Sequence, residues 1–231
     1  HSGVMGAGGF AEYMTVSAKA VYKLADDVDL DHAALPEPLA CCVHSINKAR
    51  IKLGDTVVII GMGIMGYFHL KLALMRGARV IVSEMDPTRK QKALDSGAHV
   101  VIDPGTQDLC EEVKKLTDGL GADVVVNTIP SAAVWNSAIQ SLAPYGRLIA
   151  YSSQDSKTPI GVDFGMMHSR EIEFIGTLNP TIEDNDIATK LITYHLIDME
   201  EVIDARFPFE QGKEAFAAAL KPGAYRVIIQ Y

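Results

Sequence analysis

Three glycines at a fixed spacing are the first residues whose types suggest chemistry. They form a G-x-G-x-x-G pattern directly after a run of β-branched residues. Between a strand and a helix, the first glycine permits a tight turn, the second lets the backbone approach a phosphate, and the third allows close helix–strand packing. The helix N-terminus then offers free N–H groups to an anion. The pattern predicts that a dinucleotide diphosphate binds at Gly61, Gly63, Ile64, Met65 and Gly66.

An acidic residue at the end of the next apolar run indicates the kind of dinucleotide. Glu84 stands 21 residues after Gly63. A carboxylate at this spacing accepts hydrogen bonds from the hydroxyls of the adenosine ribose and repels a 2′-phosphate. NAD is therefore predicted rather than NADP. Arg89 is expected at the same end of the cofactor, where its charge acts against that preference. The alternative is a glycine turn in another α/β protein, with Glu84 merely exposed.

A second motif in the same region is interpreted as structural. Tyr67 and Lys71 have the Tyr-x-x-x-Lys spacing of short-chain dehydrogenases, but they fall on the helix that follows the glycine loop. They would lie beside the sheet and not at a nicotinamide ring. We therefore expect Tyr67 and Leu70 to pack in the core and Lys71 to be solvated.

Composition limits the class of protein. Of the 231 residues, 48% are hydrophobic and 22% are charged, with a formal net charge of −8. This balance is typical of a soluble globular protein, and an acidic chain is poorly suited to nucleic acids or anionic membranes. No apolar run has the roughly 18 residues of a transmembrane helix. Three cysteines, Cys41, Cys42 and Cys110, indicate reduced thiols and a cytoplasmic location.

Alternation of apolar runs and amphipathic segments predicts the fold. Continuous β-branched runs are typical of strands buried on both faces of a parallel sheet. The predicted strands are residues 56–60, 79–83, 100–103, 123–127, 147–151 and 171–175. The predicted helices are residues 63–76, 87–96, 108–117 and 131–143. We expect an α/β fold with a doubly wound, parallel, six-stranded Rossmann sheet.

Segments outside this alternation are also expected to be partly regular. Residues 8–16 alternate apolar and polar positions, which predicts a half-buried strand. A helix is expected after Pro36, with Pro38 at its first position. Near the C-terminus, a helix over residues 210–220 and a strand over residues 225–231 are expected.

The chain resembles the medium-chain dehydrogenase/reductase superfamily, and more closely its zinc-type branch, which includes sorbitol, threonine and butanediol dehydrogenases. The resemblance covers nearly the whole chain and depends on matches at residues 9–13, 37–40, 61–66, 119–125 and 144–147. It implies a Rossmann NAD-binding domain over residues 46–178. Residues 1–45 and 179–231 would be remnants, at both ends, of a catalytic β domain related to the co-chaperonin barrel.

The same resemblance implies a catalytic zinc ion in the intact parent. In the family an early cysteine and a histidine, often with a glutamate beside it, bind this zinc, and those segments are not in this sequence. The chain therefore looks like a fragment without the N-terminal catalytic segment, and we expect the fragment itself to be inactive. Glu37, in the Glu-Pro-Leu match, stands where the branch supplies a further zinc ligand, direct or through water. The alternative is an acid that favours a helix N-terminus.

Three residues that follow Glu37 are expected to be structural. We expect His44 to be a buried, hydrogen-bonded core residue, and a role near the nicotinamide or a zinc-bound water is the alternative. Cys41 and Cys42 would point about 100° apart on a helix. We expect them to be small core residues and not metal ligands.

The turns after the later strands are candidates for the rest of the cofactor site, because ligands of open parallel sheets bind beyond the carboxyl ends of the strands. The resemblance implies that these turns meet the adenosine, the nicotinamide ribose and the carboxamide. The candidates are Asn127, Thr128, Ile129, Ser152, Thr177 and Asn179. Each has a plain polar loop as its alternative.

The implied function is an NAD-dependent, zinc-type oxidoreductase that transfers hydride between a secondary alcohol or polyol and NAD. Its partners would be a small-molecule alcohol or ketone and a second copy of the chain, joined by extending the sheet at residues 171–175. Three alternatives stay open: a zinc-free, NADPH-dependent reductase of the same superfamily, a non-catalytic nucleotide-binding module, and a methyltransferase, which the strand order and the position of Gly66 fit less well. Glu84 and the Glu-Pro-Leu segment argue against the first alternative.

Overall fold

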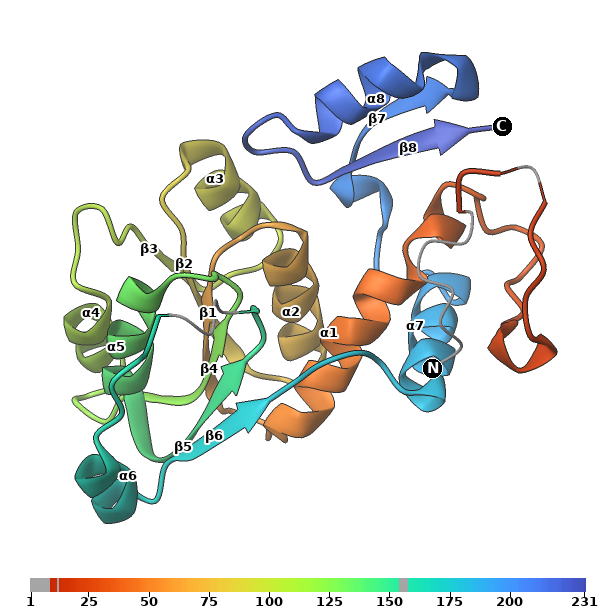
Figure 1. Ribbon diagram of the computed structural model, residues 1–231. Coiled ribbons are helices and arrows are strands. Elements are labelled where there is room, and N and C mark those ends of the chain that lie inside the picture. Colours follow the sequence, from red (N-terminus) through yellow and green to blue (C-terminus); the bar gives the residue numbers. More distant parts are fainter. Residues whose placement is uncertain (1–8, 12, 154–157) are drawn as a thin grey trace.

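The computed structural model describes residues 9–11, 13–153 and 158–231, and its centre is a six-stranded parallel sheet (Figure 1). The strands lie in the order β3-β2-β1-β4-β5-β6, and every pairing is parallel. The strands are β1 Thr56–Ile60, β2 Arg79–Ser83, β3 Val100–Ile102, β4 Ala122–Asn127, β5 Leu142–Ala150 and β6 Glu173–Gly176. The strand order reverses between β1 and β4, as in Rossmann folds. The predicted doubly wound α/β sheet is confirmed.

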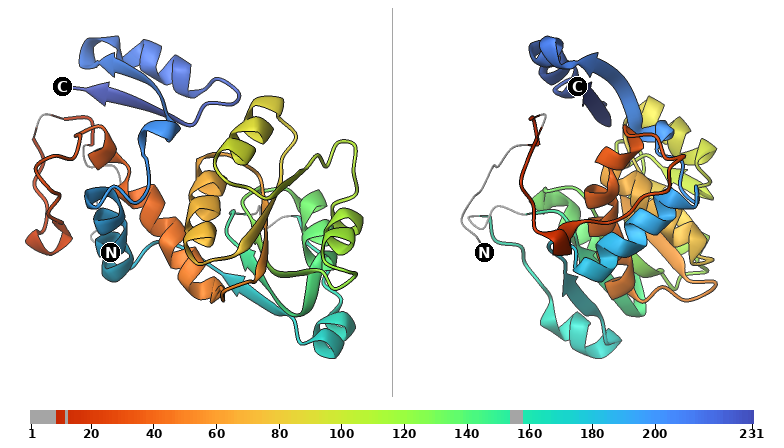
Figure 2. Two further views of the ribbon diagram at one scale, coloured as in Figure 1. Left: turned by 180° about the vertical axis from the view of Figure 1, so that it is seen from behind. Right: turned by 90° about the vertical axis from the view of Figure 1, so that its right-hand side faces the viewer.

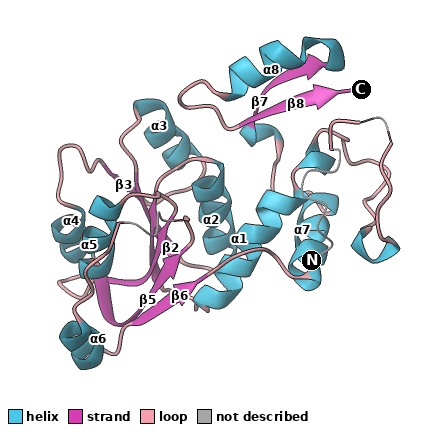
Figure 3. Ribbon diagram, in the orientation of Figure 1, coloured by secondary structure: helices cyan, strands magenta, loops and turns pink. Residues whose placement is uncertain are grey.

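Side chains of the central strands divide between two cores, because successive residues of a strand point to opposite faces. On β1, Val57 and Ile59 belong to one buried cluster, whereas Val58 and Ile60 belong to the other. Helices cover both faces of the sheet (Figure 3). The first face carries α1 Pro36–Ala49, α2 Ile64–Met75, α3 Pro87–Asp95 and α7 Ile182–Thr193. The second face carries α4 Leu109–Leu116, α5 Ala132–Gln140 and α6 Phe164–Arg170.

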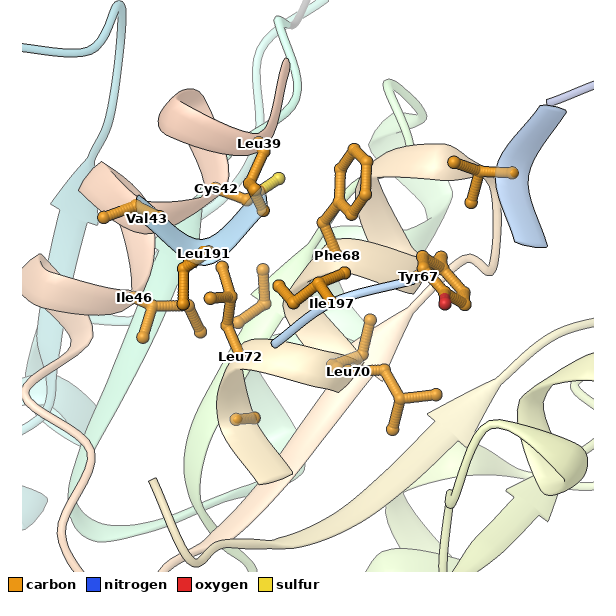
Figure 4. Packing of buried hydrophobic residues seen from close by; sticks show 14 of the residues in the cluster. Leu39, Cys42, Val43, Ile46, Tyr67, Phe68, Leu70, Leu72, Leu191 and Ile197 are labelled. Carbon is orange, nitrogen blue, oxygen red and sulfur yellow. The ribbon is translucent and has the colours of Figure 1, made fainter. Parts of the chain in front are cut away.

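The first core is built largely where α1, α2 and α7 meet. Figure 4 shows Leu39, Cys42, Val43 and Ile46 of α1 packed with residues of α2 and α7 and with Ile197. Burying one such aliphatic side chain stabilises the fold by roughly 1.5–3 kcal/mol. This packing holds α1, and with it Glu37 and Cys41, in a fixed position beside the sheet.

Local sequence signals set the helix ends. The side chain of Asp86 accepts a hydrogen bond from the Arg89 N–H and so caps α3, with Pro87 at the first helical position. At α1, however, the first helical residue is Pro36, so the prediction that Pro38 starts this helix was wrong. The short turn at residues 32–34 leads directly into α1, and Leu39 N–H already bonds to Leu35 O.

Residues after α7 form a small second unit. β7 (Ile203–Pro208) and β8 (Arg226–Gln230) pair in parallel, and α8 (Gly212–Ala219) connects them. Figure 2 shows this unit beside the main sheet and not as a continuation of it. The predicted C-terminal helix and strand correspond to α8 and β8. β7, α6 and α7 were not predicted. Short 3-10 helices lie at Ala18–Ala20, His32–Ala34, Glu200–Val202 and Phe209–Gln211.

Two further sequence predictions differ from the structure. Within residues 8–16, Gly8 and Glu12 lie outside the described residues, and the others form no strand. None of the described strands pairs with this segment, and a lone strand is not stable. The side chain of Tyr13 is accordingly 91% exposed and not half-buried. The helix expected over residues 131–143 ends at Gln140, because Leu142, the first residue of β5, already pairs with Ala122 of β4. The register of this strand pair shifts between Ala122 and Val124.

Among the described residues, no helix has both the length and the apolar character that a bilayer crossing requires.

Candidate functional site

The glycine loop joins β1 to α2 in a geometry that only glycine fits at two positions. Gly61 has φ +92°, and a Cβ there would lie 2.7 Å from Thr128 Oγ1. A Cβ on Gly66 would lie 2.0 Å from the carbonyl oxygen of Gly61. The first glycine therefore makes the turn, and the third allows α2 to pack against the end of β1. Both roles agree with the sequence prediction.

Gly63 is different, because a Cβ at this position would meet no protein atom within 4 Å. Gly63 is the N-cap of α2, and its carbonyl oxygen accepts the first helical hydrogen bond, from Tyr67 N–H. The N–H groups of Ile64, Met65 and Gly66 precede that bond and have no acceptor within the helix. They stand at the positive end of the helix dipole. The loop can therefore receive a phosphate close to its backbone.

Glu84 lies directly after β2, beside the glycine loop. Its Oε2 accepts a hydrogen bond from Met62 N–H at 2.8 Å, and its Oε1 accepts from the N–H groups of Met85 and Asp86 at 2.7 and 2.9 Å. These three bonds fix the carboxylate and connect β2 to the loop. A carboxylate has about four acceptor positions, so Glu84 retains capacity for a ligand hydroxyl while its negative charge disfavours a phosphate.

A pocket of about 330 Å³ opens between the ends of β2, β3 and β4. Glu84 lies on one side, with Ile129 and Val134 on the other. Pro104 and Leu109 complete a largely apolar wall. A slot with apolar walls and a carboxylate at its edge suits a flat ring joined to a hydroxyl-bearing sugar.

A second pocket, of about 410 Å³, lies beyond the ends of β4, β5 and β6. Four residues predicted separately from the sequence meet here, although they come from three turns: Thr128, Ser152, Thr177 and Asn179. Tyr151, Ser153, Leu178 and Cys41 complete the lining. The hydroxyl of Thr128 donates to Ile60 O at 2.7 Å, which fixes that side chain against β1.

Unpartnered polar atoms collect around this edge of the sheet. Among the described residues, six buried side-chain polar atoms have no hydrogen-bond partner, and four of them are in residues at the strand ends: Ser83 Oγ, Asn127 Nδ2, Ser152 Oγ and Thr177 Oγ1. A fifth is Arg89 Nε on α3. Burying such an atom without a partner costs about 1–3 kcal/mol. This concentration fits a polar ligand that lies along the edge, and a dinucleotide has the required length and polarity.

The described residues fit a dinucleotide, but they do not form a binding site for zinc. No three histidine, cysteine, aspartate or glutamate side chains gather within them at metal-binding distances. Glu37 is exposed in the first turn of α1 and accepts a hydrogen bond from Cys41 Sγ at 3.4 Å. Burial, and then the nearby Glu37 carboxylate, raises the pKa of the Cys41 thiol to about 11. A protonated thiol and one carboxylate do not hold zinc.

His44 is hydrogen-bonded as expected, but it is only partly buried and not a fully buried core residue. Its Nδ1 lies 2.8 Å from Oδ2 of Asp184, which connects α1 to the start of α7. Burial would raise the pKa of Asp184, but hydrogen bonds from Thr181 and His44 outweigh it, and the pKa is lowered. Cys42 is buried as expected, whereas Cys41 lines the second pocket and is only partly buried, so the prediction of a core residue was wrong for Cys41.

The Tyr-x-x-x-Lys pair is structural, with one difference from the prediction. Tyr67 and Leu70 are fully buried, as expected. Lys71 is half-buried and not fully solvated, because its Nζ lies 3.5 Å from Ser96 O and 5.5 Å from the ring centre of Tyr67. Tyr67 contacts Lys92 of α3 and donates a hydrogen bond to Asp198 O, and neither Tyr67 nor Lys71 lines the second pocket.

Sequence reasoning missed three residues at or near the site. Cys41 and Tyr151 line the second pocket. Tyr225 donates a hydrogen bond to the glycine loop from a segment far away in the sequence. A thiol one helical turn after Glu37 was a usable signal for Cys41, but no local pattern indicates that Tyr225 contacts the loop.

Comparisons with known proteins agree with this geometry. The sequence profile of the zinc-binding dehydrogenases matches residues 54–193. The chain is 30% identical to D-arabitol-phosphate dehydrogenase of Enterococcus avium, over 96% of this chain and 64% of the relative. It is 28% identical to a sorbitol dehydrogenase of Halalkalibacterium halodurans, over 96% of this chain and 65% of the relative.

Comparison with solved structures also finds a zinc-binding dehydrogenase. It is described as a zinc-binding dehydrogenase from Sinorhizobium meliloti 1021 bound to NADP, and it superposes with a TM-score of 0.90 at 27% identity, over 96% of this chain and 66% of that one. The chain thus spans slightly less than two thirds of the length of these three relatives. The profile match covers more than half of the chain and includes the whole glycine loop and all six strands of the sheet. The chain belongs to the zinc-binding dehydrogenase family.

Proposed function

We propose that this chain is the NAD-binding part of a zinc-type dehydrogenase that transfers hydride between a secondary alcohol or polyol and NAD. The observation that carries the proposal is the glycine loop with its open position at Gly63, next to the fixed carboxylate of Glu84. The relatives named above act on sugar alcohols or their phosphates, according to their names. This supports a polyol as the substrate of the whole protein.

Each part of the site has a proposed task. The N–H groups of Ile64, Met65 and Gly66 bind the diphosphate, and Glu84 accepts from the adenosine ribose hydroxyls. Arg89 lies at the same end, with Asn127 at the end of β4 and Ile129 in the turn after it. Thr128, Ser152, Thr177 and Asn179 bind the nicotinamide half in the second pocket, where their hydroxyls and amide hold the ring against the end of the sheet.

We propose the domain division expected from the sequence. Residues 46–178 contain β1 to β6 and form the cofactor domain, whereas residues 1–45 and 179–231 belong to a catalytic domain related to the co-chaperonin barrel. The zinc ion would act in that domain of the whole protein, where it would polarise the alcohol oxygen. Glu37 stands at the domain boundary, at the start of α1, and is the residue of this chain proposed to approach the metal.

Binding of the cofactor tests the proposal. NADH and NADPH are titrated side by side into the chain and followed by the fluorescence of the reduced nicotinamide. The proposal predicts saturable binding with a clear preference for NADH, because Glu84 repels the 2′-phosphate. A preference for NADPH would contradict the role of Glu84, and no binding of either cofactor would contradict the proposed function.

Two observations favour NADPH over NADH as the cofactor, and the alternative function with that cofactor is a zinc-free reductase of the same superfamily. The solved relative from Sinorhizobium meliloti binds NADP, and Arg89 is a cation on the helix that follows Glu84. A whole protein of this kind would reduce activated double bonds without zinc. The two functions separate in an assay of the whole protein, because a metal chelator would abolish polyol oxidation and would leave a zinc-free reductase active.

We also propose that the protein is cytoplasmic and forms a homodimer through β6. The three cysteines are free in the structure, which agrees with a reducing compartment. β6 is an edge strand, and Phe174 on it is 36% exposed. Light scattering of the wild type and of Phe174→Lys tests the dimer: the wild type should have twice the mass of the variant, and equal masses would contradict it.

A further inference from the structure

The C-terminal unit reaches the glycine loop through one side chain. The hydroxyl of Tyr225, just before β8, donates a hydrogen bond to the carbonyl oxygen of Met62 at 2.8 Å. Met62 stands between Gly61 and Gly63, and its N–H donates to Glu84 at 2.8 Å. Both backbone polar groups of Met62 are therefore held, one by Glu84 after β2 and the other by Tyr225 before β8.

The ring of Tyr225 also faces two cations of α3. The guanidinium carbon of Arg89 lies 5.6 Å from the ring centre, and Nζ of Lys92 lies 5.3 Å from it. Both distances are within the range of a cation–π interaction. Figure 1 shows the connection before β8 reaching toward α3, in agreement with these contacts. The ring attracts the two cations but does not neutralise them as a carboxylate would.

Arg89 has a further property that points to the cofactor. Its Nε is buried and has no hydrogen-bond partner in the structure. The Arg89 N–H bonds to Asp86, two residues after Glu84, so the start of α3 is fixed close to that carboxylate. The Tyr225 ring thus contacts the guanidinium of a residue whose backbone is fixed close to Glu84.

Tyr225 remains a hydrogen-bond donor over the physiological range. Burial raises the pKa of Tyr225 to about 12, although the Arg89 charge acts in the opposite direction. The hydroxyl is thus neutral at pH 7, and its bond to Met62 O does not titrate.

We propose that Tyr225 is a positioning residue for cofactor binding and cofactor choice. Its hydroxyl fixes the glycine loop for the diphosphate. Its ring holds the Arg89 guanidinium, so that Arg89 does not swing out to neutralise a 2′-phosphate beside Glu84. This inference rests on the proposed function and deepens it, because the preference for NAD then depends on a residue outside the Rossmann sheet.

Two variants of Tyr225 separate the roles of the hydroxyl and the ring. Tyr225→Phe removes only the hydroxyl, and it should weaken NADH and NADPH alike by about two- to tenfold, the usual value of one hydrogen bond. Tyr225→Leu also removes the ring, and it should bring the dissociation constants of NADPH and NADH several-fold closer together. Tyr231→Leu is the matched control, because Tyr231 stacks on Phe209 and does not contact the loop.

Fluorescence titration gives the dissociation constants of NADH and NADPH for each variant, and a thermal melt gives its stability. A Tyr225→Phe variant that binds like the wild type, or a Tyr225→Leu variant that keeps the wild-type ratio of the two dissociation constants, would overturn the inference. The same changes in Tyr231→Leu would also overturn it, since they would show a general loss of stability. A wild type that binds neither cofactor contradicts the proposed function first, and with it the role of Tyr225.

Discussion

The backbone N–H of Met62 donates a hydrogen bond to the Glu84 carboxylate at 2.8 Å, and so joins the glycine loop to the end of β2. Met62 of the loop and Glu84, the residue proposed to bind the ribose, are therefore parts of one rigid arrangement. A cofactor that meets one of them meets the other in a fixed geometry.

Removing the charge of Glu84 should reduce cofactor discrimination. In Glu84→Gln, the one carbonyl oxygen can accept either from Met62 N–H or from the N–H groups of Met85 and Asp86, and the repulsion of a 2′-phosphate is lost. We expect the ratio of the NADPH and NADH dissociation constants to fall by about tenfold, or about 1.4 kcal/mol. Titration of both cofactors measures it, with Glu210→Gln, an exposed carboxylate in the C-terminal unit, as the control. An unchanged ratio of the two dissociation constants would show that Glu84 does not bind the adenosine ribose.

Two glycines of the loop should respond differently to alanine. At Gly63 the added Cβ meets no protein atom, so Gly63→Ala should melt like the wild type but bind NADH at least tenfold more weakly, because the Cβ fills the space of the diphosphate. At Gly66 the Cβ would clash with Gly61 O, so Gly66→Ala should lose about 2 kcal/mol of stability as well as binding. Thermal melts and NADH titrations of both variants decide this. Full NADH affinity in Gly63→Ala would contradict the placement of the diphosphate.

The sequence predicts the sheet and the loop well because both depend on local signals. A continuous β-branched run such as β1 is enough by itself to predict a strand buried on both faces. The glycine spacing is also local, because a side chain at Gly61 or Gly66 would clash with neighbouring atoms. β5 was predicted to begin at Arg147, where the apolar run starts. Its true start, at Leu142, depends on pairing with Ala122.

Contacts between distant segments were not predictable. Tyr225 and Met62 are 163 residues apart, and neither has a pattern that indicates the other. The expected strand at residues 8–16 failed for a related reason. Alternation shows which face of a strand would be buried, but not whether a partner strand is available.

The buried His69 should make the fold sensitive to acid. Its Nδ1 donates to Met65 O and its Nε2 accepts from Ser45, and burial lowers its pKa from 6.5 to about 4. The unfolded chain binds this proton near pH 6.5 and the folded chain does not. The stability is therefore complete above pH 6.5 and falls by about 1.4 kcal/mol per pH unit between pH 6.5 and 4.

Urea denaturation at several pH values measures this loss. In His69→Gln, the unfolding free energy should fall less steeply between pH 6.5 and 4 than in the wild type. The difference in slope should be about 1.4 kcal/mol per pH unit, which corresponds to one proton. The exposed His168 on α6 provides the control, and His168→Gln should keep the wild-type slope. Equal slopes in the wild type and His69→Gln would show that His69 does not titrate as proposed.

The half of the sheet that carries the second pocket depends on Arg147. Its guanidinium donates to the carbonyl oxygens of Ala49 and Arg50 at the end of α1 and to Asp55 at 2.9 Å. Because this group is buried, Arg147→Met should lose about 3 kcal/mol of unfolding free energy. The exposed pair of Lys190 and Asp186 is the comparison, and Lys190→Ala should lose less than about 1 kcal/mol. Similar losses in the two variants by urea denaturation would contradict the role of Arg147.

The central claim is that the glycine loop, Glu84 and the two pockets bind one NAD molecule, and a crystal structure of the chain with NADH tests it most directly. We predict the diphosphate at the N-terminus of α2, the adenosine ribose hydroxyls on Glu84 with the adenine beside Ile129, and the nicotinamide in the pocket of Thr128, Ser152 and Thr177. A dinucleotide bound elsewhere, or with its ribose hydroxyls away from Glu84, would contradict the account.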